Sequence, residues 1–220
     1  MSTVFQPFGL KPVYHPSGLD RAVPFIGTNT YTPGSTYTAP YSLSSGQSFW
    51  QFQPVAITST GQLTIANQAA ASGKVYGVFD GIEYTNSDGR RSVAKYAAKT
   101  TLDASTNLVF WIFADPALVY EAQINGSATT GAIGTSYNFD TTTGSTVTDG
   151  YSIGNGGAGF STTALLATAV GSGVQGQVRV VGLGREVAYP SGQLNQWGDA
   201  FTIVQVQISN NQFAAPSVSV

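Results

Sequence analysis

The sequence predicts an all-β protein, with a jelly-roll, β-sandwich or barrel-like core and an extended N-terminal arm. Three observations support this prediction. Short segments rich in Val, Thr, Tyr and Phe recur along the chain, and a turn signal follows about every ten residues. Helix-like periodicity is scarce. The 220 residues also include 26 Gly and 10 Pro, which interrupt helices and form turns.

Composition divides the chain into an arm and a domain. Residues 1–50 are rich in Pro, Tyr, Thr and Ser and form the predicted arm. Residues 51–220 form the predicted β domain, which contains a Gly/Thr/Ser-rich irregular insertion at about 126–175. Within this insertion, residues 161–170 (STTALLATAV) fit either one short helix with a Ser/Thr cap or a short β-edge segment.

The first predicted strands follow the arm. Residues 53–67 (QPVAITSTGQLTIAN) predict two short strands joined by a Ser-Thr-Gly turn. Residues 74–86 (KVYGVFDGIEYTN) alternate, which places four side chains on one face: Tyr76, Val78, Ile82 and Tyr84. Asp80 interrupts that face, and we expect it to form hydrogen bonds at a bend, because an unpaired buried carboxylate is costly.

The later strands show three patterns. Residues 107–116 (NLVFWIFADP) are continuously apolar, which is typical of a strand buried on both faces. Residues 117–126 (ALVYEAQING) alternate and then turn at Asn-Gly. Residues 176–184 and 199–213 complete the set. In the last of these, Val204, Val206 and Ile208 are predicted to face inward, and Gln205, Gln207 and Ser209 outward.

A charged hairpin connects two of the strands. Residues 86–91 (NSDGRR) match a type I turn with a Gly bulge, in which Gly89 takes a positive φ. Arg90 and Arg91 then fall on opposite faces of the returning strand, so the pair does not form an anion clamp. The tip is either solvated, or one arginine binds a carboxylate of a neighbouring subunit.

Candidate catalytic groups are few and scattered. His15 is the single histidine, and no nucleophile motif surrounds it, so we expect a solvated or packing imidazole. Asp80 and Glu83 lie an odd number of residues apart, which points them to opposite faces of a regular strand. The chain has no Cys. We expect no catalytic residue, no metal site, no cofactor and no enzymatic activity.

Charge narrows the range of partners. Charged residues make up 9 % of the chain, against roughly 25 % in an ordinary soluble domain, and the net charge is −2. So few basic residues argue against nucleic acid and anionic membranes as partners. A weakly charged surface suits a protein buried in an assembly, because the centres of interfaces are depleted in charge. We therefore expect an obligate partner or a homo-oligomer.

The order of motifs along the chain resembles the head decoration, or capsid cement, proteins of tailed bacteriophages. The resemblance runs through FGLKPVYHPSG, PYSLSSGQSFWQFQPV, VYGVFDGIEYTNSDGRRSVAKY, FWIFADPALVYEAQ, VRVVGL and WGDAFTIVQVQISNNQF. It implies a non-enzymatic virion protein on the capsid exterior, assembled in the host cytoplasm. Its implied partners are the major capsid protein and further copies of itself, with a trimer favoured.

Two sets of residues are candidates for capsid or subunit contacts. The arm would supply apolar anchors, and the hairpin would supply charged contacts: Phe5, Phe8, Leu10, Tyr14, Phe25, Arg90 and Arg91. Removing residues 2–25 is expected to abolish capsid binding and to leave the β core folded.

Two other functions remain open. A carbohydrate-binding module of a phage tail or cell surface would use exposed aromatic side chains, for which Trp50, Trp111 and Trp197 are candidates, although core packing also explains them. A hydrolase is opposed by the single histidine and the scattered carboxylates.

Overall fold

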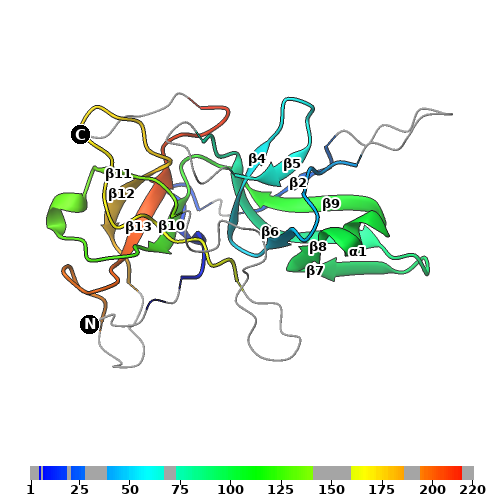
Figure 1. Cartoon of the computed structure of the whole chain (residues 1–220), viewed down its shortest axis with the longest axis horizontal. Helices are drawn as coiled ribbons and strands as arrows, with labels where there is room; N and C mark the ends of the chain where they lie inside the picture. The colour runs from blue at the N-terminus through cyan, green and yellow to red at the C-terminus, as the bar shows by residue number, and fades with distance from the viewer. Residues whose placement is uncertain are drawn as a thin grey trace.

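A computed structural model describes residues 5, 7–18, 21–27, 39–66, 73–140, 160–185 and 194–214. It is an all-β structure of antiparallel sheets, as the sequence predicts. Figure 1 shows an elongated molecule with one large sheet toward each end of its long axis.

The first large sheet has five strands in the order β1-β10-β13-β12-β11, all antiparallel to their neighbours. The strands are β1 (Lys11–Tyr14), β10 (Val119–Gln123), β13 (Ile203–Ile208), β12 (Val178–Leu183) and β11 (Ser136–Tyr137). A short 3-10 helix, η1 (Thr130–Ala132), precedes β11.

The second large sheet has six strands, with a path β2-β9-β6-β4-β5 and with β7 paired to β6. The strands are β2 (Val23–Phe25), β9 (Thr106–Phe113), β6 (Gly77–Thr85), β4 (Gln53–Ile57), β5 (Leu63–Ile65) and β7 (Arg91–Ala94). Beside it lie a two-stranded sheet, β3 (Ser48–Trp50) with β8 (Tyr96–Ala98), and the one-turn helix α1 (Lys99–Asp103).

Each large sheet buries its own core cluster. The five-stranded sheet packs Tyr120, Val180 and Val206 inward, and residues of the predicted insertion, Phe139 and Leu165, join them. The six-stranded sheet buries a separate set that includes Phe49, Phe79, Leu102, Phe110 and Ile112. The insertion is therefore partly a core element of the domain.

Several predicted strand features are confirmed. β4 and β5 form the predicted hairpin. Along β13, Val204, Val206 and Ile208 are buried in the core.

One prediction for the end of this strand is wrong. Ser209, predicted to face outward, is buried and donates a hydrogen bond to the Gly176 carbonyl at 2.7 Å.

Two predictions for single segments are decided by the structure. β9 alternates between fully buried residues such as Phe110 and half-buried ones such as Trp111, so it is not buried equally on both faces. Residues 161–170 form no helix. Leu165 instead makes isolated β-bridges to Ile124 and Phe139, which agrees with the β-edge alternative.

The predicted common face of Tyr76, Val78, Ile82 and Tyr84 fails at Val78: the other three pack in the second core cluster, whereas Val78 enters the first. The pairing of β6 with β9 shifts register between Phe79 and Gly81, which is the mark of a β-bulge at Asp80. The bulge changes the side-chain alternation along β6. Phe79 and Ile82, which are an odd number of residues apart, therefore enter the same core cluster, while Val78 enters the other.

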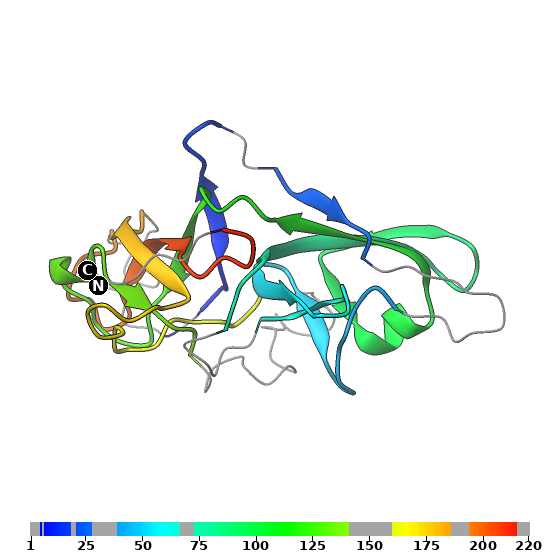
Figure 2. The same cartoon turned by 90° about the horizontal axis from the view of Figure 1, so that it is seen from above.

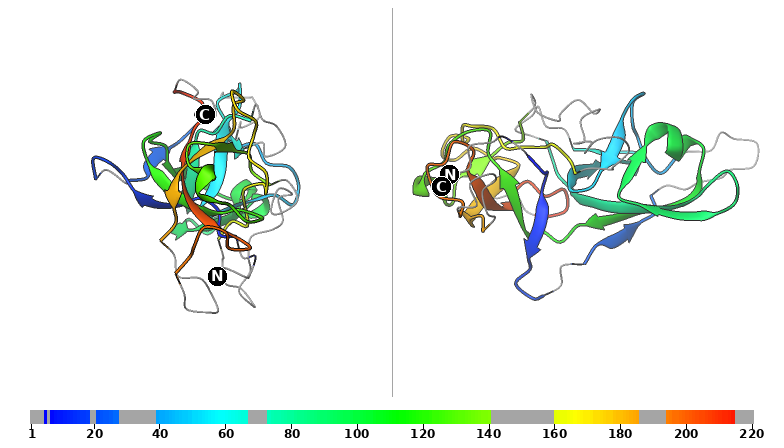
Figure 3. Two further views of the ribbon diagram at one scale, coloured as in Figure 1. Left: turned by 90° about the vertical axis from the view of Figure 1, so that its left-hand side faces the viewer. Right: turned by 90° about the horizontal axis from the view of Figure 1, so that it is seen from below.

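The N-terminal arm supplies an edge strand to each large sheet. β1 pairs with β10 and β2 pairs with β9, and both lie along the same side of the molecule (Figures 2 and 3). Leu10, just before β1, is 0 % exposed and lies in the core of the five-stranded sheet. A chain without residues 2–25 would lose two edge strands and a core side chain. It is therefore not expected to keep its core intact, contrary to the expectation from the sequence.

Candidate interaction site

A groove of about 580 Å³ opens on the outer face of the five-stranded sheet. It is lined by Val13, Tyr14, Val119, Glu121, Val181, Arg185 and Gln205. Its walls are partly valine side chains and partly polar groups, a mixture that is typical of sites that bind another molecule.

Strand register brings the polar groups together. Lys11, Glu121 and Gln205 are direct cross-strand partners on β1, β10 and β13. Directly opposed residues point to the same face of a sheet, and this face is opposite to the one that buries Tyr120 and Ala122. The alternation of β10 thus places Glu121 outside the core but inside the groove.

Glu121 is only 3 % exposed, which is unusual for a carboxylate. One of its oxygens, Oε1, accepts a hydrogen bond from the backbone N–H of Arg185 at 2.7 Å. Within the described part of the chain, Glu121 forms no ion pair with a Lys, Arg or His side chain. A buried carboxylate without a cation is costly, so this group favours a cationic partner from outside the chain.

The other polar groups of the groove are equally available. Within the described part of the chain, the Arg185 guanidinium and the Gln205 side-chain amide take part in no hydrogen bond or ion pair. The Tyr14 side chain is 59 % exposed at the rim. The groove therefore presents one carboxylate, one guanidinium, one amide and one phenol to a partner.

His15 fixes the end of β1 beside the groove. Its Nδ1 accepts a hydrogen bond from the Ser17 N–H at 3.0 Å, and its Nε2 lies 3.0 Å from Asp115 Oδ2. This arrangement ties the arm to the turn before β10, where Asp115 also accepts the Ala117 N–H at 2.8 Å. His15 is buried, which agrees with the packing alternative and not with the solvated one. Nearby, burial and then the charge of Asp115 raise the pKa of the Tyr120 phenol far above its usual value.

The predicted arm residues do not form one patch. Phe5 contacts the Phe201 ring at a centroid distance of 5.2 Å, and Phe25 contacts the Tyr76 ring at 5.9 Å. Phe8 is half-buried. Leu10 is enclosed in the chain's own core, so it is not accessible to a capsid surface. Of the predicted contact residues in the arm, Tyr14 lines the groove, next to Val13.

The predicted hairpin geometry is confirmed. Gly89 has a φ of +81°, and the Asn86 N–H and the Arg90 carbonyl close the turn at 2.8 Å. Arg91 forms an ion pair with Glu83 across the β6–β7 pair. Arg90 instead stays at the tip, where its Nε lies 3.6 Å from Asp88 Oδ2. The two arginines therefore have different surroundings, as the predicted opposite faces require.

Asp80 and Glu83 do not act together. At the bulge, Asp80 Oδ2 lies 2.8 Å from Lys95 Nζ, and Oδ1 accepts a hydrogen bond from Gln51 Nε2 at 3.0 Å. Glu83 forms an ion pair with Arg91. Each carboxylate thus has its own cation and stabilises a different part of the second sheet.

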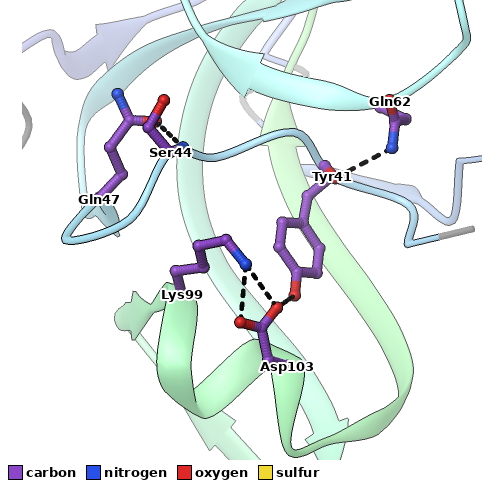
Figure 4. A network of polar contacts seen from close by, with 6 residues as sticks. All are labelled: Tyr41, Ser44, Gln47, Gln62, Lys99 and Asp103. Carbon is purple, nitrogen blue, oxygen red and sulfur yellow. Dashed lines mark hydrogen bonds and ion pairs between the residues drawn. The ribbon is translucent and has the colours of Figure 1, made fainter.

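A further polar network holds the segment before β3 against α1 (Figure 4). Tyr41 donates a hydrogen bond to Asp103 Oδ1 at 2.5 Å, and Lys99 Nζ lies 2.7 Å from Asp103 Oδ2. Hydrogen bonds from Lys99 and Tyr41 lower the pKa of Asp103 below its ordinary value. Gln62 extends the network to the Tyr41 carbonyl at 3.2 Å. All of these groups have partners within the chain, so the network is structural.

The three tryptophans lie in or against the packed parts of the structure. Trp50 contacts the Tyr96 ring at 4.3 Å, Trp197 packs against the first core cluster, and Trp111 is half-buried in β9. The described residues contain no group of three or more His, Asp or Glu side chains that could hold a metal ion. They also contain no helix of the length and apolarity needed to span a membrane.

Sequence reasoning missed Glu121, Arg185 and Gln205. A signal was present for the first, because a carboxylate in an alternating strand next to a buried run lies on the face opposite the core. Comparisons of the chain with family models, with curated proteins and with solved structures found no match.

Proposed function

We propose that this protein is a structural virion protein that binds the outer surface of a phage capsid and stabilises the shell. Its partners would be the major capsid protein and further copies of itself, with a trimer favoured, and it would act without a cofactor, nucleic acid or membrane. The resemblance in motif order supports the phage assignment, and the low charge supports a protein that works within an assembly.

One structural observation carries the proposal. The arm forms the edge strands of both large sheets along one side, and it exposes apolar side chains there: Val13, Tyr14, Val23 and Ile26. Edge strands and exposed apolar side chains are both ready places for protein association. This side of the molecule is therefore the proposed capsid-binding surface, in place of a separate arm that wraps the shell.

The test uses virions of the phage that encodes the chain, stripped of this protein and mixed with purified variants. Val23→Asp places a charge on the exposed face of the β2 edge and should reduce capsid occupancy at least about tenfold, a loss of roughly 1.4 kcal/mol. Val93→Asp is the matched control, because Val93 is also exposed but lies on β7, at a different edge. Imaging of the particles gives both the position and the occupancy.

Full occupancy by Val23→Asp, or equal losses for both variants, would contradict the proposed surface. Absence of wild-type density from the capsid exterior would contradict the function itself.

The alternative of a carbohydrate-binding module draws support from the groove, where Tyr14 lies with Glu121 and Gln205. Glycan binding by the free protein, without capsid association, would favour this alternative.

A further inference from the structure

The groove presents two unmatched charges in fixed positions. Glu121 is almost fully buried and is held by the Arg185 backbone, while the Arg185 side chain lines the same groove without an ion pair among the described residues. A complementary partner must bring a cation for Glu121 and an anion for Arg185. It must also be slender enough to enter a concave site between valine side chains.

The tip of the β6–β7 hairpin carries both charges that such a partner needs, a cation on Arg90 and an anion on Asp88. The Asp88 and Arg90 side chains are 56 % and 85 % exposed, and the only ion pair of either within the described residues is the 3.6 Å contact between them. The turn projects the two side chains together, because the Arg90 N–H also donates to Asp88 Oδ1 at 3.2 Å. A tight turn is also a narrow element.

The tip and the groove lie toward opposite ends of the molecule. In Figure 1, β7 lies at one end of the long axis, and β10, β12 and β13 lie at the other. A tip therefore cannot enter the groove of its own chain. It can only enter the groove of another molecule.

We propose that the groove on the five-stranded sheet receives the β6–β7 hairpin tip of a second copy of this chain. Arg90 of the incoming copy binds Glu121, and Asp88 of the incoming copy binds Arg185. Each copy contributes one tip and one groove, so the contact is head-to-tail. Such contacts close into rings when the rotation between copies allows it and otherwise extend as filaments.

This inference rests on one part of the proposed function, the homo-oligomer, and it names the two surfaces through which the copies contact each other. It concerns the free protein. Its test therefore uses no capsids, and capsid occupancy is measured separately, so that failure of one proposal is distinguishable from failure of the other.

The first test measures the molar mass of the full chain in solution over a concentration series. The wild-type protein should be oligomeric. Arg90→Ala and Glu121→Gln should each raise the dissociation constant at least about tenfold, because each removes one partner of a charge pair buried in the contact. Circular dichroism and thermal unfolding verify that both variants are folded.

Arg91→Ala is the matched control. Arg91 is the next residue in the chain and is also exposed, but it belongs to β7 and binds Glu83 of its own chain. Its substitution should leave the dissociation constant within about twofold of the wild-type value, as is usual outside an interface.

Mixing the two interface variants tests the head-to-tail geometry directly. Arg90→Ala retains an intact groove, and Glu121→Gln retains an intact tip. At a concentration where each weakened variant alone is mostly monomeric, an equimolar mixture should therefore form a dimer with one complete contact.

Three outcomes would overturn the proposal. They are a wild-type protein that is monomeric at every concentration, an Arg90→Ala variant that assembles like the wild type, and a mixture that remains monomeric. Equal weakening by Arg90→Ala and Arg91→Ala would likewise show that the tip acts through general charge and not through Glu121.

Discussion

The two ends of the molecule treat their charges differently. At the six-stranded end, the described carboxylates have cations of their own chain close by: Asp80 with Lys95, Glu83 with Arg91, and Asp103 with Lys99. At the five-stranded end, Glu121 is more deeply buried than any of these and has no cation among the described residues. Charge that is satisfied internally stabilises the fold, whereas charge left unsatisfied in a groove is available to a partner.

The same contrast exists within the arm. Leu10 and Tyr14 are four residues apart at the edge of the five-stranded sheet, yet one is 0 % and the other 59 % exposed. The arm thus builds the core with one side chain and lines the groove with another.

Leu10→Ala should have the largest effect. Leu10 is fully enclosed in the first core cluster, and truncating such a leucine leaves a cavity that costs about 2–5 kcal/mol of unfolding free energy. Tyr14→Ala, at the end of β1, is the control in the same segment, and its cost should stay below about 0.5 kcal/mol because Tyr14 is mostly solvent-exposed. Urea unfolding measures both. Similar losses for the two variants would mean that the arm does not divide its roles in this way.

Asp80→Asn should have an intermediate effect. The substitution removes the ion pair with Lys95 and keeps an oxygen for Gln51, so we expect a loss of about 1 kcal/mol. Asp88→Asn is a suitable comparison, because Asp88 is exposed at the tip and its ion pair is longer, at 3.6 Å. Its loss should be smaller, about 0.5 kcal/mol or less. If the order of the two losses were reversed, the bulge carboxylate would not be structural.

Local sequence features predicted much of this structure, because they act over a few residues. The Asn86–Arg91 turn follows from Gly89 and the Asx side chains, and the inward faces of β10 and β13 follow from alternation. Long-range pairing could not be predicted in the same way. Nothing in Lys11–Tyr14 specifies β10 as its partner, and the bulge at Asp80 is the point after which Ile82 enters a different core cluster from Val78.

The groove was harder to predict for the same reason. It combines residues from β1, β10, β12, β13 and the segment after β12, and strand order alone brings them together. The sequence marks Glu121 as facing away from the core, but only the structure shows that the Arg185 N–H binds it and that Tyr14 lines the same groove.

The lowered pKa of Asp103 predicts a small pH dependence of the unfolding free energy, arising at the six-stranded end. Hydrogen bonds from Lys99 and then Tyr41 lower its pKa below the ordinary value of 3.8, so the folded state binds this proton more weakly than the unfolded state. The stabilisation is fully present above pH 3.8 and is lost as the pH falls through the lower folded-state pKa. Because Asp103 is about half exposed, the contribution should not exceed about 1 kcal/mol.

The measurement compares the wild type with Asp103→Asn by urea unfolding between neutral and acidic pH. The difference between the two proteins should be constant above pH 3.8 and should shrink below it. A difference that grows on acidification would have the wrong sign for a carboxylate with a lowered pKa.

Glu121→Gln should have the smallest effect on folding, although Glu121 is the most buried of the carboxylates compared here. Glutamine keeps an oxygen for the Arg185 N–H and removes a charge that has no cation among the described residues. In an Arg90→Ala background, where the proposed contact with another copy is absent, the unfolding free energy should change by less than about 0.5 kcal/mol or should increase. Burial alone would suggest the opposite, since breaking a buried ion pair usually costs about 3–5 kcal/mol. A loss of that size would mean that Glu121 is satisfied within its own chain, and the two ends of the molecule would then treat charge alike.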